Sequence, residues 1–126
     1  MDREWWRQYK PEVLDTFSGE LYGRYYEDHV DRVPVYHGSN SGAGAILIAA
    51  YFGANNIYLL GYDCQVSGKK HWHDDHPDKL GNCDSISHWP KYFEDVKRMT
   101  PGVNIVNCSR QTALTIWPRI PLEQAL

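Results

Sequence analysis

The residues best suited to chemistry lie in a polar stretch that contains HWHDDH, residues 71–76. An imidazole titrates near neutral pH and can act as a general base on a sugar or nucleotide hydroxyl, so His73 and His76 are our candidate catalytic bases. The spacing of His71 and His73 would also suit a metal ion, but the stretch offers no pair of thiolates and we expect no tightly bound metal. A third interpretation is an exposed polar loop whose histidines have no chemical role.

A second group of candidate residues precedes a long apolar segment. The sequence GSNSGAG, residues 38–44, leads from an expected strand into an expected helix. Free N–H groups at a helix N-terminus form an anion site, and glycines let a phosphate approach the backbone. The residues that we expect to contact such a ligand are Gly38, Ser39, Asn40, Ser41 and Gly42. The alternative is a helix N-cap whose small residues serve tight packing of the helix against a sheet.

Asp63 is the third candidate, because it follows an apolar run that is typical of a strand buried on both faces. Ligands of open parallel sheets bind beyond the carboxyl ends of the strands, where an aspartate can contact a ribose, a metal or a basic partner. We count Asp63 among the catalytic residues on this ground. The alternative is a carboxylate that caps the following turn.

Helices and strands that could position these residues alternate along the chain. We expect helices over residues 41–52 and 85–99, and strands over residues 56–60 and 103–107. The weaker signals are strands over residues 33–36 and 21–26, and a partly helical segment over residues 2–17 that Pro11 interrupts. Helices and strands alternating at these lengths predict parallel βαβ units and one α/β domain over residues 1–126. Few strands leave open sheet edges, and the apolar helix needs cover on several sides, so we expect a homo-oligomer.

Composition excludes some partners. The 126 residues carry a formal net charge of -3, which argues against a broad nucleic-acid surface or an anionic membrane surface. The sequence has neither an apolar run long enough to cross a membrane nor a signal peptide, and its three cysteines form no C-x-x-C pair. We therefore expect a cytoplasmic protein.

Several stretches together resemble a known family. SNSGAGAILIAAYFGANNIYLLGYDCQ, HWHDDHP, VNIVNCSRQTAL and WPRIPLEQAL are similar to a family of uncharacterised bacteriophage proteins, which resembles the motility-accessory-factor and 6-hydroxymethylpterin-pyrophosphokinase-like proteins. More distantly, residues 40–63 are similar to bacterial CMP-sialic-acid-dependent sialyltransferases. The resemblance implies a metal-independent nucleotide-sugar fold with a histidine base. It places Asn40, Ser41 and Gly42 at the nucleotide and Asp63 at the ribose or catalytic edge.

The resemblance also sets the expected fold and function. The fold is a Rossmann-like three-layer domain with a small, mostly parallel sheet, truncated at the N-terminus relative to relatives that begin with a further α/β segment. The function is binding of a nucleotide or nucleotide sugar, of glycosyltransferase type, with no certain cofactor. Two alternatives stay open: a non-enzymatic phage accessory or nucleotide-binding module, and a metal-dependent hydrolase or transferase that uses the HWHDDH loop.

Overall fold

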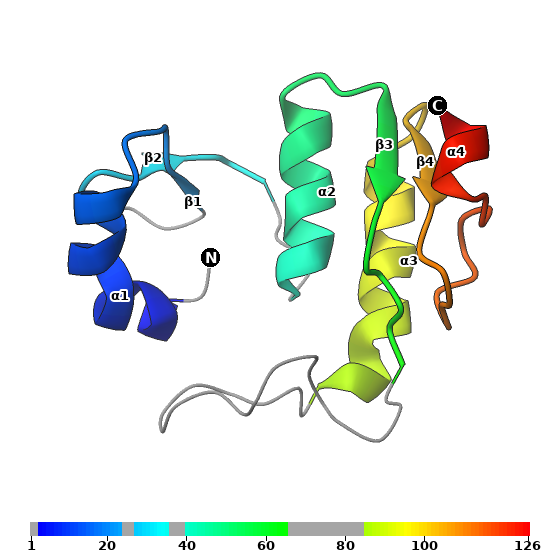
Figure 1. Ribbon diagram of the computed structural model, residues 1–126, viewed down its shortest axis with the longest axis horizontal. Coiled ribbons are helices and arrows are strands. Elements are labelled where there is room, and N and C mark those ends of the chain that lie inside the picture. The colour runs from blue at the N-terminus through cyan, green and yellow to red at the C-terminus, as the bar shows by residue number, and fades with distance from the viewer. Residues whose placement is uncertain (1–2, 24–26, 36–39, 66–84) are drawn as a thin grey trace.

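The computed structural model describes residues 3–23, 27–35, 40–65 and 85–126 (Figure 1). Its elements follow in chain order: α1 (Arg3–Thr16), β1 (Tyr22–Gly23), β2 (Asp31–Arg32), α2 (Ser41–Tyr51), β3 (Asn56–Leu59), a 3-10 turn η1 (Ile86–His88), α3 (Trp89–Met99), β4 (Asn104–Asn107) and α4 (Leu122–Ala125).

Strands β3 and β4 form a parallel pair, and α3 lies between them in the chain. The register places Ile57 opposite Ile105 and Leu59 opposite Asn107. The sequence predicts these strands because apolar, β-prone runs without alternation suit a parallel sheet buried on both faces. The prediction is confirmed to within one residue at the end of β3 and at the start of β4.

Helix α2 begins where the sequence indicated. Asn40 has the extended backbone of an N-cap (φ -149, ψ 136), and its side-chain oxygen accepts a hydrogen bond from the Ala43 N–H. At the other end, Gly53 has a φ of 89, a conformation that side-chain-bearing residues rarely adopt. The second expected helix is also present, as η1 followed by α3, with Pro90 in the first turn of α3, where a missing N–H costs little.

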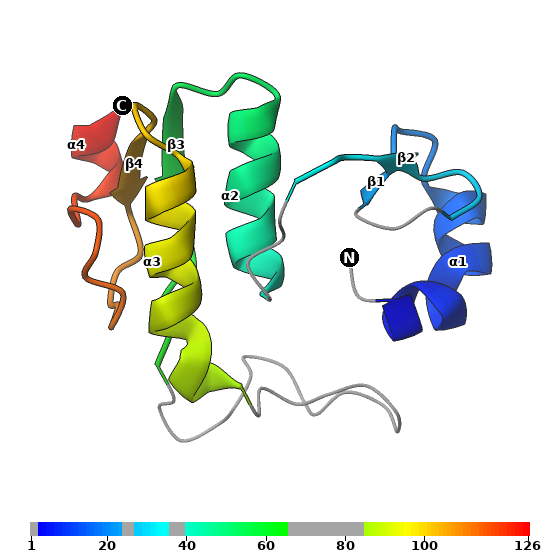
Figure 2. The same ribbon diagram turned by 180° about the vertical axis from the view of Figure 1, so that it is seen from behind.

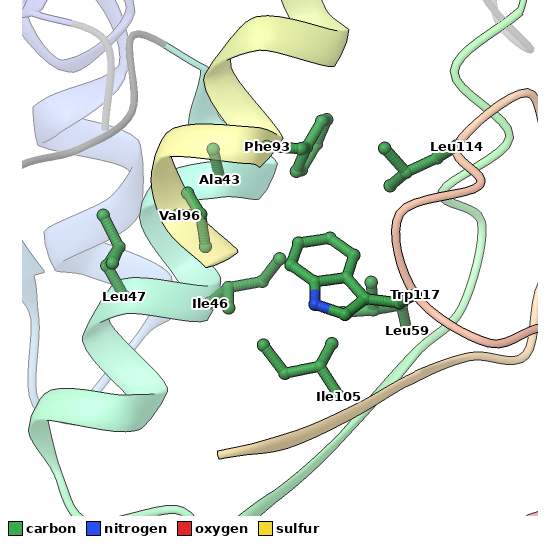
Figure 3. Close-up of a cluster of buried hydrophobic side chains, with 9 residues drawn as sticks. All are labelled: Ala43, Ile46, Leu47, Leu59, Phe93, Val96, Ile105, Leu114 and Trp117. Carbon is green, nitrogen blue, oxygen red and sulfur yellow. The ribbon is translucent and has the colours of Figure 1, made fainter. Parts of the chain in front are cut away.

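One apolar core joins these elements (Figure 3). Phe93 and Val96 of α3 meet Ile46 of α2 against the side of the sheet that carries Leu59 and Ile105. Helices α2 and α3 lie side by side (Figure 2). The remaining members of the cluster, from α2 and from the chain after β4, are Ala43, Leu47, Leu114 and Trp117.

After β4 the chain folds back along that strand instead of leaving the domain. The N–H of Asn107 donates to the Pro118 carbonyl at 2.9 Å, and the N–H of Ile120 donates to the Asn107 carbonyl at 3.2 Å. This return places Trp117 against α3, where its ring meets the Phe93 ring edge-on with 6.0 Å between the ring centroids. The prolines keep this segment from forming one helix, and α4 starts only after Pro121.

The N-terminal part departs from the expectations. Helix α1 runs unbroken through Pro11, which lies on an exposed position, so the one backbone bond lost there can be replaced by water. The strand expected over residues 33–36 is absent from residues 33–35, because the parallel pairing with β1 is made by Asp31 and Arg32 instead. Of the strand expected over residues 21–26, the structure has Tyr22–Gly23, and the remainder lies partly outside the described residues.

The described elements make this a mixed α/β protein with small parallel sheets. Both helices of the core contribute to a single cluster on the sheet, so the three-layer Rossmann-like arrangement stays a prediction. The Tyr22 and Phe52 rings, 4.8 Å apart, connect β1 to the end of α2. Within the described ranges no helix is long and apolar enough to cross a membrane. The expected homo-oligomer also remains a prediction.

The core predicts a large cost for one truncation. Phe93 of α3 is 1% exposed and belongs to the same core cluster as α2 and Trp117, so Phe93→Ala should lower the free energy of unfolding by about 3–5 kcal/mol. The matched control is Phe17→Ala, because Phe17 is 51% exposed and its loss should cost less than about 1 kcal/mol. Urea denaturation measures both. Equal costs for the two variants would show that Phe93 is not central to the core.

Candidate functional site

The start of α2 lies beside the residues that follow β3 and β4 at one edge of the sheet. Figure 1 shows that α2 and α3 begin at the end of the molecule where β3 and β4 finish. The Tyr62 hydroxyl donates to the Gly42 carbonyl at 3.0 Å, and the Tyr62 N–H donates to the Ser109 hydroxyl oxygen at 2.8 Å. We call this region, residues 40–42, 61–64 and 108–112, the carboxyl edge.

Two backbone N–H groups at the start of α2 have no hydrogen-bond partner among the residues that the structure describes. Asn40 occupies the N–H groups of Ala43 and Gly44, through its side-chain oxygen at 3.1 Å and its carbonyl at 2.9 Å. The first two helical residues, Ser41 and Gly42, have no carbonyl of their own helix to bond. Ser41 is exposed and Gly42 is half-buried. Their two amides can therefore donate to an anion at this helix end.

Gly42 has a packing role that the sequence analysis weighed as the alternative. A Cβ added to Gly42 would lie 3.0 Å from a Tyr62 ring carbon and 3.1 Å from the Asn40 side-chain oxygen. The missing side chain therefore makes room for the Tyr62 ring. Contact between a ligand and Gly42 stays a prediction and would have to use its N–H.

Three polar side chains at the edge were not among the sequence candidates. Asn107 and Thr112 both donate to the Tyr62 carbonyl, at 3.3 and 2.6 Å, and Ser109 accepts from the Tyr62 N–H. Asn107 is fully buried, at 0% exposure. The available signal was an asparagine and a serine, Asn107 and Ser109, at the end of an otherwise apolar run, because polar residues there must find partners when buried.

Asp63 lies at the carboxyl edge as expected. It is exposed, and its carbonyl accepts a hydrogen bond from the Ala113 N–H at 2.7 Å. Within the described part of the chain its carboxylate makes no hydrogen bond, so the alternative role as a turn cap has no support there. Contact with a ribose or an acceptor remains a prediction.

Cys64, next along the chain, is held as a thiol. It is half-buried with a backbone φ of 51, and burial, together with the Asp63 carboxylate, raises its pKa to about 11. The thiolate is the nucleophilic form of cysteine, so this side chain is a poor nucleophile at neutral pH. Burial also raises the pKa of Tyr62, whose hydroxyl donates to the Gly42 carbonyl.

The structure brings Asn40, Ser41, Gly42 and Asp63 to one edge. The other candidates, Gly38, Ser39, His73 and His76, lie outside the described residues, and so does the whole HWHDDH sequence. The described residues that flank the segment with both histidines are Gln65, which follows the carboxyl edge, and Ser85, which directly precedes η1. Among the residues that the structure describes, no three His, Cys, Asp or Glu side chains are grouped to hold a metal ion.

Comparison with known proteins gives no relative: no family model, no curated protein and no solved structure matches this chain.

The raised pKa of Cys64 predicts slow alkylation. At pH 7.5 its thiolate fraction should be about a hundredfold lower than that of a thiol with the ordinary pKa of 9.0. The rate of reaction with iodoacetamide should then rise about tenfold per pH unit up to roughly pH 10.5. Mass spectrometry of the peptide that contains Cys64 measures the rate, with the guanidinium-unfolded chain as control. A native rate at pH 7.5 equal to the unfolded one would contradict this assignment.

Proposed function

We propose that the carboxyl edge binds the phosphate of a nucleotide or nucleotide sugar. The observation that carries the proposal is the position of the Ser41 and Gly42 amides, at the start of an 11-residue helix and beside the ends of two parallel strands. Helix N-termini favour anions through their unpaired N–H groups and the helix dipole. Sheet edges of this kind are where α/β proteins commonly bind ligands.

The charges around the start of α2 also favour an anion. The first turn of α2 contains no acidic residue that would compete for its N–H groups. Arg110 is exposed and follows β4 at the same edge, and its carbonyl accepts a hydrogen bond from the Arg119 guanidinium at 2.7 Å. We assign Arg110 a pairing role with the phosphate, because guanidinium groups bind phosphate oxygens in a two-pronged geometry.

The proposal extends to transfer chemistry of glycosyltransferase type. Asp63 would accept a hydrogen bond from a ribose or acceptor hydroxyl, since an exposed carboxylate offers only acceptors at neutral pH. His73 or His76 would remove the proton from the acceptor hydroxyl as its oxygen bonds to the sugar, while the bond from the sugar to the nucleotide phosphate breaks and the nucleotide leaves. Support for this part comes from the sequence. Both histidines belong to the segment between Gln65 and Ser85. Gln65 directly follows Cys64, and Ser85 directly precedes η1.

One substitution tests the amide contact directly. Ser41→Pro removes the N–H and the hydroxyl of the first helical position, where proline is well tolerated. The extended backbone of Asn40 (φ -149, ψ 136) is the conformation that a residue before proline prefers, so α2 should keep its start. Ser41→Ala is the matched control, because it removes the hydroxyl and keeps the amide.

Calorimetric titration with CMP, CDP and UDP, with and without Mg²⁺, measures the effect. We expect the wild-type chain to bind a nucleotide and cytidine to bind more weakly. Ser41→Pro should lower nucleotide affinity about tenfold or more, since hydrogen bonds to charged groups contribute roughly 1.5–3 kcal/mol. Ser41→Ala should lower it less. A folded Ser41→Pro chain with unchanged nucleotide affinity would remove the α2 amides from the site.

A further inference from the structure

The backbone N–H and the backbone carbonyl of Tyr62 both bond to side chains from a distant part of the chain. Its N–H donates to the Ser109 hydroxyl oxygen at 2.8 Å, and its carbonyl accepts from the Thr112 hydroxyl at 2.6 Å and from the Asn107 amide at 3.3 Å. All three partners are side chains, and all lie 45 or more residues away in the sequence. We call Asn107, Ser109 and Thr112 the Tyr62 clasp.

The hydrogen bonds of the clasp replace the backbone–backbone bonds between β3 and β4, which end before Tyr62. Gly61, with a φ of 74, and Cys64, with a φ of 51, both have left-handed backbones, so residues 61–64 cannot continue the regular pairing of β3. The last ladder-like bond is from the Cys108 N–H to the Leu59 carbonyl at 2.8 Å. Beyond this bond, the backbone N–H and carbonyl of Tyr62 bond instead to two side-chain hydroxyls and the Asn107 amide.

The residues of the clasp are also linked to one another through the Asn107 side chain. The Asn107 amide donates to the Thr112 oxygen at 3.1 Å, and the Asn107 side-chain oxygen accepts from the Ser109 N–H at 3.0 Å. The Thr112 oxygen accepts in addition from the Leu114 N–H at 2.9 Å. Because Asn107 is fully buried, removing one member leaves polar groups without partners in the protein interior.

The other end of Tyr62 reaches α2. Its hydroxyl donates to the Gly42 carbonyl at 3.0 Å, and its ring meets the Phe93 ring edge-on at 5.9 Å. The absent Cβ of Gly42 is what lets the ring approach this closely. Hydrogen bonds to the backbone and to the hydroxyl of Tyr62 therefore link Thr112 to the first turn of α2 through this one residue.

We propose that Thr112 is a positioning residue, which acts through Tyr62 to hold the first turn of α2 and its Ser41 and Gly42 amides in place at the carboxyl edge. Its value for phosphate binding rests on the proposed function. The coupling itself belongs to the ligand-free protein and can be measured there. A residue after β4 would thus determine how well the donors at the start of α2, far earlier in the chain, are ordered.

Amide hydrogen exchange by NMR on the full, ligand-free chain tests the coupling. The reporters are the Ala43 and Gly44 amides, which bond to Asn40 in the first turn of α2, and the reference is the Thr100 amide at the end of α3. Thr112→Val keeps the shape of the side chain and removes its oxygen. It should speed exchange at the reporters about fivefold relative to Thr100, which is the factor that one neutral hydrogen bond typically provides. Thr112→Ser keeps the oxygen and should stay within about twofold of wild type.

A double-mutant cycle tests the route. Tyr62→Phe removes only the hydroxyl that reaches Gly42 and should also speed reporter exchange about fivefold. If Thr112 acts through that hydroxyl, Thr112→Val in the Tyr62→Phe background should add nothing, whereas independent effects would multiply to about 25-fold. Should Thr112→Val fail to fold, Ser109→Ala takes its place in the same cycle, since it removes the acceptor of the Tyr62 N–H.

Three other results of these experiments would contradict the proposed role of Thr112. Faster exchange confined to Ala113 and Leu114, equal acceleration at Thr100 and the reporters, or multiplying effects in the cycle would each overturn the positioning role. Titration of the same variants with CMP, CDP and UDP separates this inference from the proposed function. A wild-type chain that binds none of these nucleotides contradicts only the proposed function, whereas nucleotide binding with no exchange coupling contradicts only the role of Thr112.

Discussion

The hydrogen bond from the Tyr62 hydroxyl to the Gly42 carbonyl fixes where α2 starts relative to the sheet. Apolar contacts such as those of Ile46 and Phe93 hold the helix against the core, but they are not directional and allow small sliding movements. A bond at one end of the helix removes that freedom where it matters for a ligand. The arrangement of donors at the carboxyl edge depends on this one contact and on whatever keeps Tyr62 in place.

The same contact explains why the glycine-rich start of α2 was ambiguous in the sequence. A glycine before a helix allows close approach of either a ligand or another part of the protein. The two cases look identical until the neighbour is known, and here the neighbour of Gly42 is the Tyr62 ring, 20 residues away in sequence. Affinity for a phosphate would therefore come from the amides of Ser41 and Gly42 and not from an open space at the missing Cβ.

The local sequence pattern predicted the helices and strands of the core. It failed where the structure depends on contacts between residues that are far apart in the chain. Apolar runs and a capping asparagine were enough to place α2, α3, β3 and β4, because burial and capping are encoded within each segment. The β-prone residues 33–35 form no strand, since a strand also needs a partner, and the pairing with β1 is made by the two residues before them. The roles of Asn107, Ser109 and Thr112 were missed for the same reason. Their partner, Tyr62, is 45 or more residues away, and no local spacing encodes that contact.

The charges at the carboxyl edge bear on which ligand the proposed function implies. Neither the Cys64 thiol nor the Tyr62 phenol adds a charge at physiological pH, because ordinary thiols and phenols are neutral there and burial raises the pKa of each further. The formal charges of the described edge residues are then the Asp63 carboxylate and the Arg110 guanidinium, while the first turn of α2 adds a partial positive charge. A bare phosphate gains from the helix and from Arg110 but is repelled by Asp63. A ligand that carries hydroxyl groups beside its phosphate can instead donate a hydrogen bond to Asp63, so a nucleotide or nucleotide sugar suits this edge better than inorganic phosphate.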